Sequence, residues 1–265
     1  MADKVEDHHI STELSRELNL FHLTMMGVGM MIGAGVFLGV GNAIRFAGPG
    51  GVLLTFALNG MVAMFTAMSY AELSSAIPRA GGAYNFARVA FGRGTSFIAG
   101  WMEWFASSVA GSLYAVTFAI YTLNYFEQLG MLNWLPLELF YAEKVLAVII
   151  GVLFVYINYR GASETGKTGA FFTLGQMITL SVIGIVGIGV AIKDPSRLQN
   201  FDPFMPLGWS QLLVTMGFTY VAFEGYEVIA QAGDEAIDPK KNLPKAMLYS
   251  IFAVTTTYLL VAFAA

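Results

Sequence analysis

Two carboxylates stand in an apolar segment where a charge is costly. The segment VAFEGYE (221–227) places Glu224 and Glu227 on either side of Gly225, well inside a run long enough to cross a bilayer. Ionisable groups at that depth bind an ion or a ligand, carry a proton, or pair with one another. We expect Glu224, which adjoins the glycine, to bind or to exchange a proton. For Glu227, a carboxylate paired within the helix bundle is an equal alternative.

A glycine-rich stretch interrupts another apolar run at a similar depth. The stretch GVGMMIGAGVF (27–37) holds the cluster Gly33-Ala34-Gly35, roughly 20 Å along a helix from the start of the run. Backbone polar groups in hydrocarbon must be satisfied, so an unwound segment is expected only where protein or a water-filled cavity surrounds it. Close helix packing through small residues four apart, such as Gly29 and Gly33, is the alternative explanation.

These two breaks are predicted to present opposite polarity to one cavity. The half-helix that starts near Gly35 would direct free N–H groups and a positive dipole end into it. The half-helix that ends near Val221 or Ala222 would direct carbonyl oxygens and a negative end there. One positive and one negative edge suit a zwitterion such as an amino acid, and they also fit an ion together with a small anion.

Two other motifs suggest nucleotide or metal chemistry. The segment GASETGKT (161–168) matches the phosphate-binding pattern G-x-x-x-x-G-K-[ST], which works as the turn between a buried strand and a helix. Apolar runs flank it here, so we interpret it as a turn between two helices. His8 and His9 could bind a metal, but a solvated tail is the simpler explanation. The chain has no cysteine, and we expect neither a metal site nor a cofactor.

The composition predicts the elements that position these residues. Of the 265 residues, 56% are hydrophobic and 12% are charged, against about 25% charged in soluble domains. We therefore predict an all-α polytopic protein in the lipid bilayer, in which each span needs about 20 apolar residues. The net charge of −4 argues against a nucleic-acid partner. The predicted spans are 21–46, 51–76, 96–126, 139–159, 168–192, 209–232 and 246–265.

Basic residues predict which side of the membrane each loop faces. With the amino terminus in the cytoplasm, ten Lys and Arg residues lie inside and four outside, as the positive-inside rule favours. We therefore predict a multi-pass protein of the cell membrane with a cytoplasmic tail over 1–20. Loop 78–94 is amphipathic, and we expect a helix on the inner membrane surface, or alternatively a gating element. For Glu72 and Glu103, nearer the inner face, we expect structural roles.

Four segments occur in an order that carries a family resemblance. They are GVGMMIGAGVF (27–37), SYAELSSAIPRAGGAY (69–84), INYRGASETGKT (157–168) and GYEVIAQAGDEAIDPKKNLPKA (225–246). Together they resemble the amino acid–polyamine–organocation (APC) superfamily of permeases, which share the leucine-transporter fold. The resemblance implies a 5+5 inverted repeat whose first and sixth helices are broken at mid-membrane.

The resemblance also implies a substrate site. Backbone of the first break would hold a carboxylate, backbone of the sixth break would hold an ammonium group, and the third span would form a wall. The residues concerned are Ile32, Gly33, Ala34 and Gly35 in the first break, Val221, Ala222, Phe223, Glu224 and Gly225 in the sixth, and Ser107 and Ser108 in the third span.

The sequence departs from the family pattern in two ways. Members usually have about twelve spans, whereas 21–192 would form the first repeat and 193–265 only the start of the second. We therefore expect either a fragment or a separate carboxy-terminal half. Some proton-coupled relatives carry a lysine at the position of Gln176, which cannot ionise. Glu224 and Glu227 then become the coupling candidates, and the coupling ion, proton or sodium, stays open.

The sequence therefore predicts a secondary permease that moves amino acids by alternating access and is not an enzyme. A membrane scaffold or sensor that kept the fold without transport is one alternative. A nucleotide-binding protein built on GASETGKT (161–168) is the other.

Overall fold

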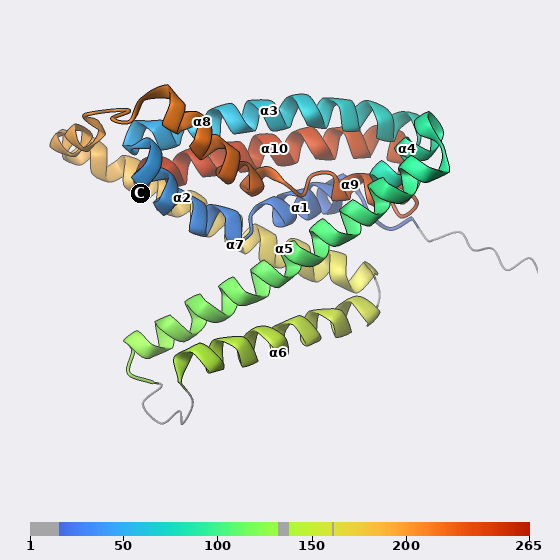
Figure 1. The fold of residues 1–265 in the computed structure, drawn as a ribbon, viewed down its shortest axis with the longest axis horizontal. Helices are drawn as coiled ribbons and strands as arrows, with labels where there is room; N and C mark the ends of the chain where they lie inside the picture. The colour runs from blue at the N-terminus through green and yellow to red at the C-terminus, as the bar shows by residue number, and fades with distance from the viewer. Residues whose placement is uncertain (1–15, 132–137, 161) are drawn as a thin grey trace, which may run out of the picture.

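The computed structural model describes residues 16–131, 138–160 and 162–265, and helices dominate them (Figure 1). One isolated parallel bridge joins Leu18 to Ala236. The helices are α1 (Leu20–Met31), α2 (Ala34–Ala47), α3 (Pro49–Ala76), α4 (Gly82–Phe91), α5 (Arg93–Gln128), α6 (Leu139–Arg160), α7 (Ala162–Lys193), the 3-10 helix η1 (Pro195–Phe201), α8 (Gly208–Thr219), the 3-10 helix η2 (Tyr220–Phe223), α9 (Val228–Gln231) and α10 (Pro239–Ala264).

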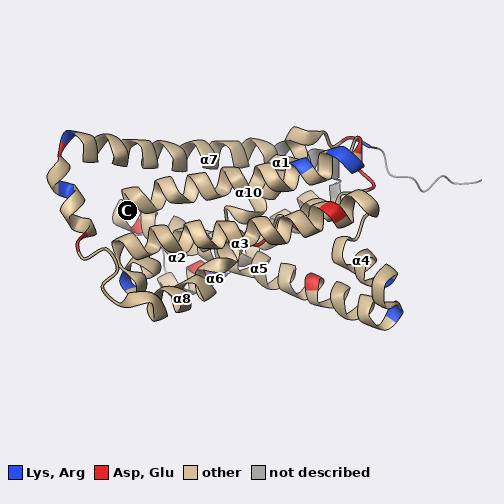
Figure 2. Ribbon diagram, turned by 90° about the horizontal axis from the view of Figure 1, so that it is seen from above, with Lys and Arg blue, Asp and Glu red and all other residues tan. Residues whose placement is uncertain are grey.

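The lengths and composition of these helices confirm an all-α polytopic membrane protein. Within the described residues, six helical segments are long and apolar enough to cross a bilayer, or seven when α1 and α2 count as one span bent by 41°. Each of the seven predicted spans corresponds to one of them. Figure 2 shows that Lys, Arg, Asp and Glu gather mostly at the two ends of the bundle, with long uncharged lengths between.

The core lies where α10 packs against α3, α7 and α1. Three buried aromatic rings meet there, because Tyr258 of α10 lies 5.4 Å from Phe56 and 5.3 Å from Phe223 between ring centroids. Edge and tilted contacts of this kind add to the stabilisation that burial itself gives. The aromatic cluster therefore fixes α10 and α3 against η2.

Helices α1, α7 and α10 run parallel to one another. Gly184 and Gly187 of α7 leave room for Leu260 and Ala264 of α10, so residue numbers rise together along both helices. Gly27 of α1 likewise lies against Ser250 of α10. Small residues allow this close approach between membrane helices.

Helices α5 and α6 form a hairpin that crosses away from the bundle (Figure 1). Their contacts are mainly with each other and with the short α4. The predicted amphipathic segment 78–94 contains α4, which is flanked by glycines with positive φ, Gly81 at 108° and Gly92 at 86°. Val89 and Phe91 are exposed there, and its placement on the membrane surface stays a prediction.

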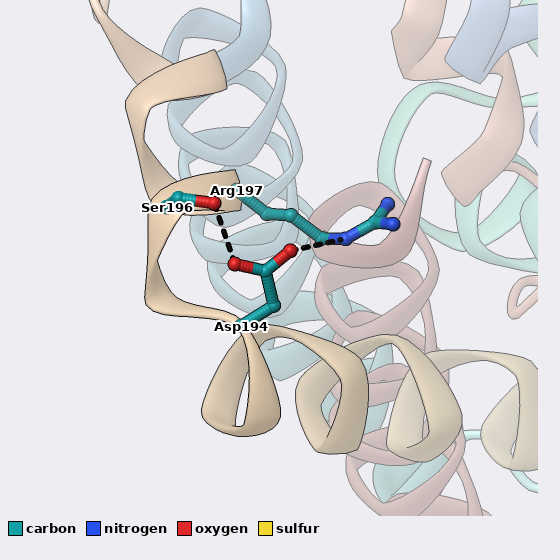
Figure 3. Close-up of polar contacts among 3 residues, drawn as sticks. All are labelled: Asp194, Ser196 and Arg197. Carbon is teal, nitrogen blue, oxygen red and sulfur yellow. Dashed lines mark hydrogen bonds and ion pairs between the residues drawn. The ribbon is translucent and has the colours of Figure 1, made fainter.

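A polar turn joins α7 to the sixth span. The Ser196 hydroxyl donates to Asp194 Oδ1 at 2.5 Å, and Arg197 Nε lies 3.3 Å from Asp194 Oδ2 (Figure 3). The three side chains thus close the turn at the start of η1, outside the apolar length of α7.

Candidate functional site

The first span is broken at Ile32 and Gly33. Helix α1 ends at Met31, the Gly33 backbone is extended, and α2 starts at Ala34, one residue before the predicted start. The first N–H groups of any helix have no partner inside it, and Gly33 has no side chain that could cap them. This end of α2 therefore presents free donors and a positive dipole end.

The sixth span is broken over residues 220–227. Helix α8 ends at Thr219 and continues as η2, Glu224 is extended, and Gly225 has φ of 125°. A positive φ of this size favours glycine, so Gly225 is the residue that lets the backbone leave the helical path at the break. The predicted break around Gly225 is confirmed, although the α-helix ends at Thr219, two residues before Val221, the nearer of the two predicted ends, Val221 and Ala222.

The two breaks touch each other. A Cβ placed on Gly35 would lie 2.8 Å from Ala222 Cα, and one placed on Gly225 would lie 2.7 Å from Met30 Cβ. Both distances are shorter than real Cβ contacts, so only glycine allows the backbones to approach this closely. The positive end of α2 and the carbonyl end of η2 consequently meet at one place.

Two tyrosines that the sequence analysis did not single out connect the breaks to other helices. The Tyr258 hydroxyl lies 2.7 Å from Met31 O and 2.9 Å from Ala222 O, and its side chain is fully buried. The Tyr114 hydroxyl of α5 donates to Met30 O at 3.3 Å. Tyrosine is common in membrane helices, so neither residue carried a signal until the structure placed it.

The two carboxylates of the sixth break lie in different environments. Glu227 Oε2 accepts a hydrogen bond from the Gly225 N–H at 2.9 Å, which stabilises the turn. Glu224 is exposed beside the break, and its own N–H donates to Val221 O at 3.3 Å. This difference favours a structural part for Glu227 and leaves the Glu224 carboxylate accessible.

Comparison with known proteins decides the family. A sequence model of the family described as "Amino acid permease" matches residues 18–265. The chain belongs to this amino acid permease family. The match confirms the predicted membership of the APC superfamily, whose members are permeases rather than enzymes.

Three relatives indicate how far this similarity extends. A branched-chain amino acid permease of Bacillus subtilis is 28% identical over 259 residues, which cover 94% of this chain and 54% of the relative. A methylthioribose transporter of the same bacterium is 29% identical over 263 residues, covering 95% and 55%. A lysine-specific permease of Escherichia coli is 30% identical over 267 residues, covering 94% and 52%. The chain spans about half the length of these permeases.

The other predicted site residues of this permease-family chain lie on α5 and α7. Ser107 and Ser108 are exposed on α5, and the Ser108 hydroxyl donates to Trp104 O of its own helix at 2.8 Å. On α5 it is Tyr114 that reaches the first break, because its ring lies against Gly33. The wall role of the two serines stays a prediction.

Gln176 lies on α7 near the depth of the first break. Thr173, one turn earlier, packs against Gly29 of α1, and the two helices run parallel. Gln176 is half-buried and shares a shallow hollow with apolar neighbours on α7, among them Phe172. Its part in coupling stays a prediction.

The segment that matches a phosphate-binding pattern is helical in the part that the structure describes. Residues 162–168 form the first two turns of α7, whereas a phosphate-binding loop needs a strand before it and an irregular turn. Gly161, His8 and His9 lie outside the described residues. The permease match accounts for the segment 157–168 without a nucleotide.

Proposed function

We propose that this chain forms the amino-terminal part of a secondary transporter that moves amino acids across the cell membrane by alternating access. In this proposal 21–192 make the first repeat, 193–265 begin the inverted second repeat, and the tail 1–20 is cytoplasmic. The observation that carries it is the contact between the two breaks, Gly35 on Ala222 and Gly225 on Met30. A carboxy-terminal half would complete the scaffold around them.

The polarity of the breaks supports a zwitterionic substrate. The free N–H groups at the start of α2 would hold the carboxylate. Carbonyl oxygens near Val221 and Ala222 would hold the ammonium group. The Val221 oxygen accepts the Glu224 N–H, and the Ala222 oxygen lies 2.9 Å from the Tyr258 hydroxyl, but a carbonyl oxygen has two lone pairs and can accept a second hydrogen bond.

The names of two relatives agree with this substrate class without fixing the side chain. Two are named for branched-chain amino acids and for lysine, and one for methylthioribose, which is not an amino acid. The amino acid assignment therefore depends on the opposite polarity of the two breaks. The exposed Glu224 carboxylate would either bind a cationic side chain or carry a coupling proton.

Uptake in proteoliposomes by the full chain, meaning this chain together with the carboxy-terminal half that completes it, separates these roles of Glu224. Loss of cationic substrates with retention of neutral ones in Glu224→Gln indicates recognition, whereas loss of the pH dependence of uptake indicates coupling. Glu127→Gln, an exposed residue at the far end of α5, is the matched control. If Glu224→Gln changes neither the range of substrates nor the pH dependence of uptake, Glu224 has neither role.

A measurement of amino acid binding tests the alternative that the protein is a membrane scaffold or sensor without transport. The proposal expects calorimetry on the folded full chain to detect a bound amino acid, and expects that binding to weaken in Gly35→Ala. A folded full chain that binds no amino acid would favour the scaffold instead.

A further inference from the structure

A buried amide on α3 bonds to the end of α8. Asn59, with 2% of its surface exposed, lies in the apolar length of α3. Its Nδ2 donates to Met216 O and to Thr219 Oγ1, both at 3.1 Å. Because a main-chain carbonyl can only accept, the amide nitrogen and not the amide oxygen faces α8. Burying an amide is costly unless it is hydrogen-bonded, so these two bonds fix the position of α3 against α8.

The acceptors of Asn59 are the last residues before the sixth break. Helix α8 ends at Thr219, and its last α-helical bond runs from the Tyr220 N–H to Met216 O. The 3-10 helix η2 follows directly. A side chain that inserts into the hydrogen-bond ladder of a helix is a known cause of bending. Met216 O accepts a bond from its own helix and one from Asn59, at the place where the helix changes its pitch.

Helix α3 also contacts the far end of η2. Phe56, one turn before Asn59, packs on Phe223 with 6.2 Å between the ring centroids. Both rings are fully buried. Between these two contacts lie Val221 and Ala222, whose carbonyl oxygens the proposed function assigns to the ammonium group. Helix α3 therefore holds this segment at both of its ends.

The acceptors of Asn59 each have a further hydrogen bond. Met216 O accepts the Tyr220 N–H, and the Thr219 hydroxyl donates to Thr215 O at 2.7 Å. Loss of the Asn59 amide therefore leaves neither acceptor unsatisfied, and such a loss costs little stability. What it removes is the restraint on the end of α8.

We propose that Asn59 is a positioning residue for substrate binding. By bonding to the last turn of α8 it sets the point at which the α-helix gives way to η2, and hence the direction in which Val221 and Ala222 present their carbonyl oxygens. This inference rests on the proposed function. It adds a residue of α3, a span to which the sequence analysis assigned no site residue.

Asn59→Leu tests the inference in the kinetics of uptake. Leucine is similar in size to asparagine and removes both bonds. We expect KM to rise at least about tenfold and the maximum rate to stay within about twofold of the parent, because the ammonium contact weakens while the protein still folds. Thr55→Val is the matched control. Thr55 lies one turn earlier on α3, is fully buried, and its hydroxyl has no hydrogen-bond partner among the described residues, so its KM should equal that of the parent.

The partner on α8 provides a second test. Thr219→Val removes the hydroxyl that accepts from Asn59, and Thr219→Ser keeps it. We expect Thr219→Val to raise KM at least about threefold, since it loses one of the two bonds, and Thr219→Ser to match the parent. A parent-like KM in Asn59→Leu would overturn the inference, and so would an equal rise in Thr55→Val. If Asn59→Leu does not fold, equal KM values in the two Thr219 variants would overturn it.

The parent chain separates this result from the proposed function. The probes are radiolabelled leucine and lysine, because two relatives are named for branched-chain amino acids and for lysine. If the folded parent, as the full chain in proteoliposomes, takes up neither, the proposed transport of these amino acids fails. Amide hydrogen exchange over 216–224 then tests Asn59 without transport. We expect exchange at least about tenfold faster in Asn59→Leu and unchanged in Thr55→Val, and equal exchange in both would overturn the inference.

Discussion

At the scale of single residues, the candidate site depends on glycines, because a residue without a side chain lets two backbones lie close together. Gly35 and Gly225 let two backbones approach to distances that no Cβ permits, and Gly225 also has a backbone conformation that other residues rarely adopt. Gly27 and Gly29 differ, since they make room for Ile229, Ser250 and Thr173 on neighbouring helices. The stretch 27–37 therefore contains glycines of both predicted kinds. Gly27 and Gly29 allow close helix packing, and Gly35 lies at the broken backbone.

Gly35→Ala tests the contact between the breaks. The added Cβ would meet the Ala222 backbone, which cannot rotate away as a side chain could, so the two breaks must move apart. We expect amino acid binding by the full chain, measured by calorimetry, to weaken at least about tenfold, or about 1.4 kcal/mol. Gly41→Ala on the same helix has open space around it and should bind normally. Equal binding by both variants would contradict the close contact.

Tyr258→Phe tests the hydroxyl that bridges Met31 and Ala222. The ring should still fill its place in the aromatic core, but buried carbonyl oxygens lose a donor, at a cost of about 1–3 kcal/mol in the free energy of unfolding. Denaturation in mild detergent, followed by tryptophan fluorescence, measures it. Tyr249→Phe changes a hydroxyl on a side chain that is 53% exposed and should cost little. A Tyr258→Phe variant as stable as Tyr249→Phe would contradict the bridge.

At the scale of elements, the sequence predicted every span and both breaks, because apolar length and glycine clusters depend on local properties of the chain. It placed the start of α2 and the end of α8 only to within one or two residues. It did not predict that η2 would continue α8 as a 3-10 helix, or that Tyr258 and Tyr114 would reach the breaks. Those features depend on how distant helices pack, which local patterns do not encode.

The turn between α7 and η1 predicts a pH effect. The hydrogen bond from Ser196, with a smaller contribution from Arg197, holds the pKa of Asp194 below its ordinary value. A depressed pKa means that this carboxylate favours the folded state above its unfolded pKa, and that the benefit is lost as pH falls through the folded pKa. We expect Ser196→Ala to raise the pKa of Asp194, as followed by carboxyl-carbon NMR. Because Asp194 is exposed, overall stability should change little. If the pKa of Asp194 is the same in Ser196→Ala as in the parent chain, the proposed role of the Ser196 hydroxyl is wrong.

At the scale of the whole molecule, the described chain consists of a packed bundle and a hairpin that stands apart. The bundle holds α1, α3, α7 and α10, whereas α5 and α6 contact mainly each other and α4. The division into a first repeat and an incomplete second repeat rests on the family resemblance. The chain covers about half the length of the branched-chain and lysine permeases.

Orientation is testable on this scale with single cysteines in the cysteine-free chain. If the amino terminus is cytoplasmic, Leu129→Cys after α5 and Gln199→Cys in η1 face outside, and Gly94→Cys at the start of α5 faces inside. An impermeant maleimide should label the first two in intact cells and the third only after permeabilisation. Labelling of Gly94→Cys alone in intact cells would mean the inverted orientation.

The bridge made by Tyr258 has a consequence for the cost of movement. A phenol has one hydrogen, and here two carbonyl oxygens stand within reach of it, one from each proposed repeat. The hydroxyl donates to one of these two oxygens at a time. If Met31 and Ala222 move apart, the Tyr258 hydroxyl can stay with either residue and still donate to its carbonyl oxygen. The link between the two repeats can therefore open without leaving an unsatisfied donor in the core, and the barrier to that movement is lower than for two bonds that must break together.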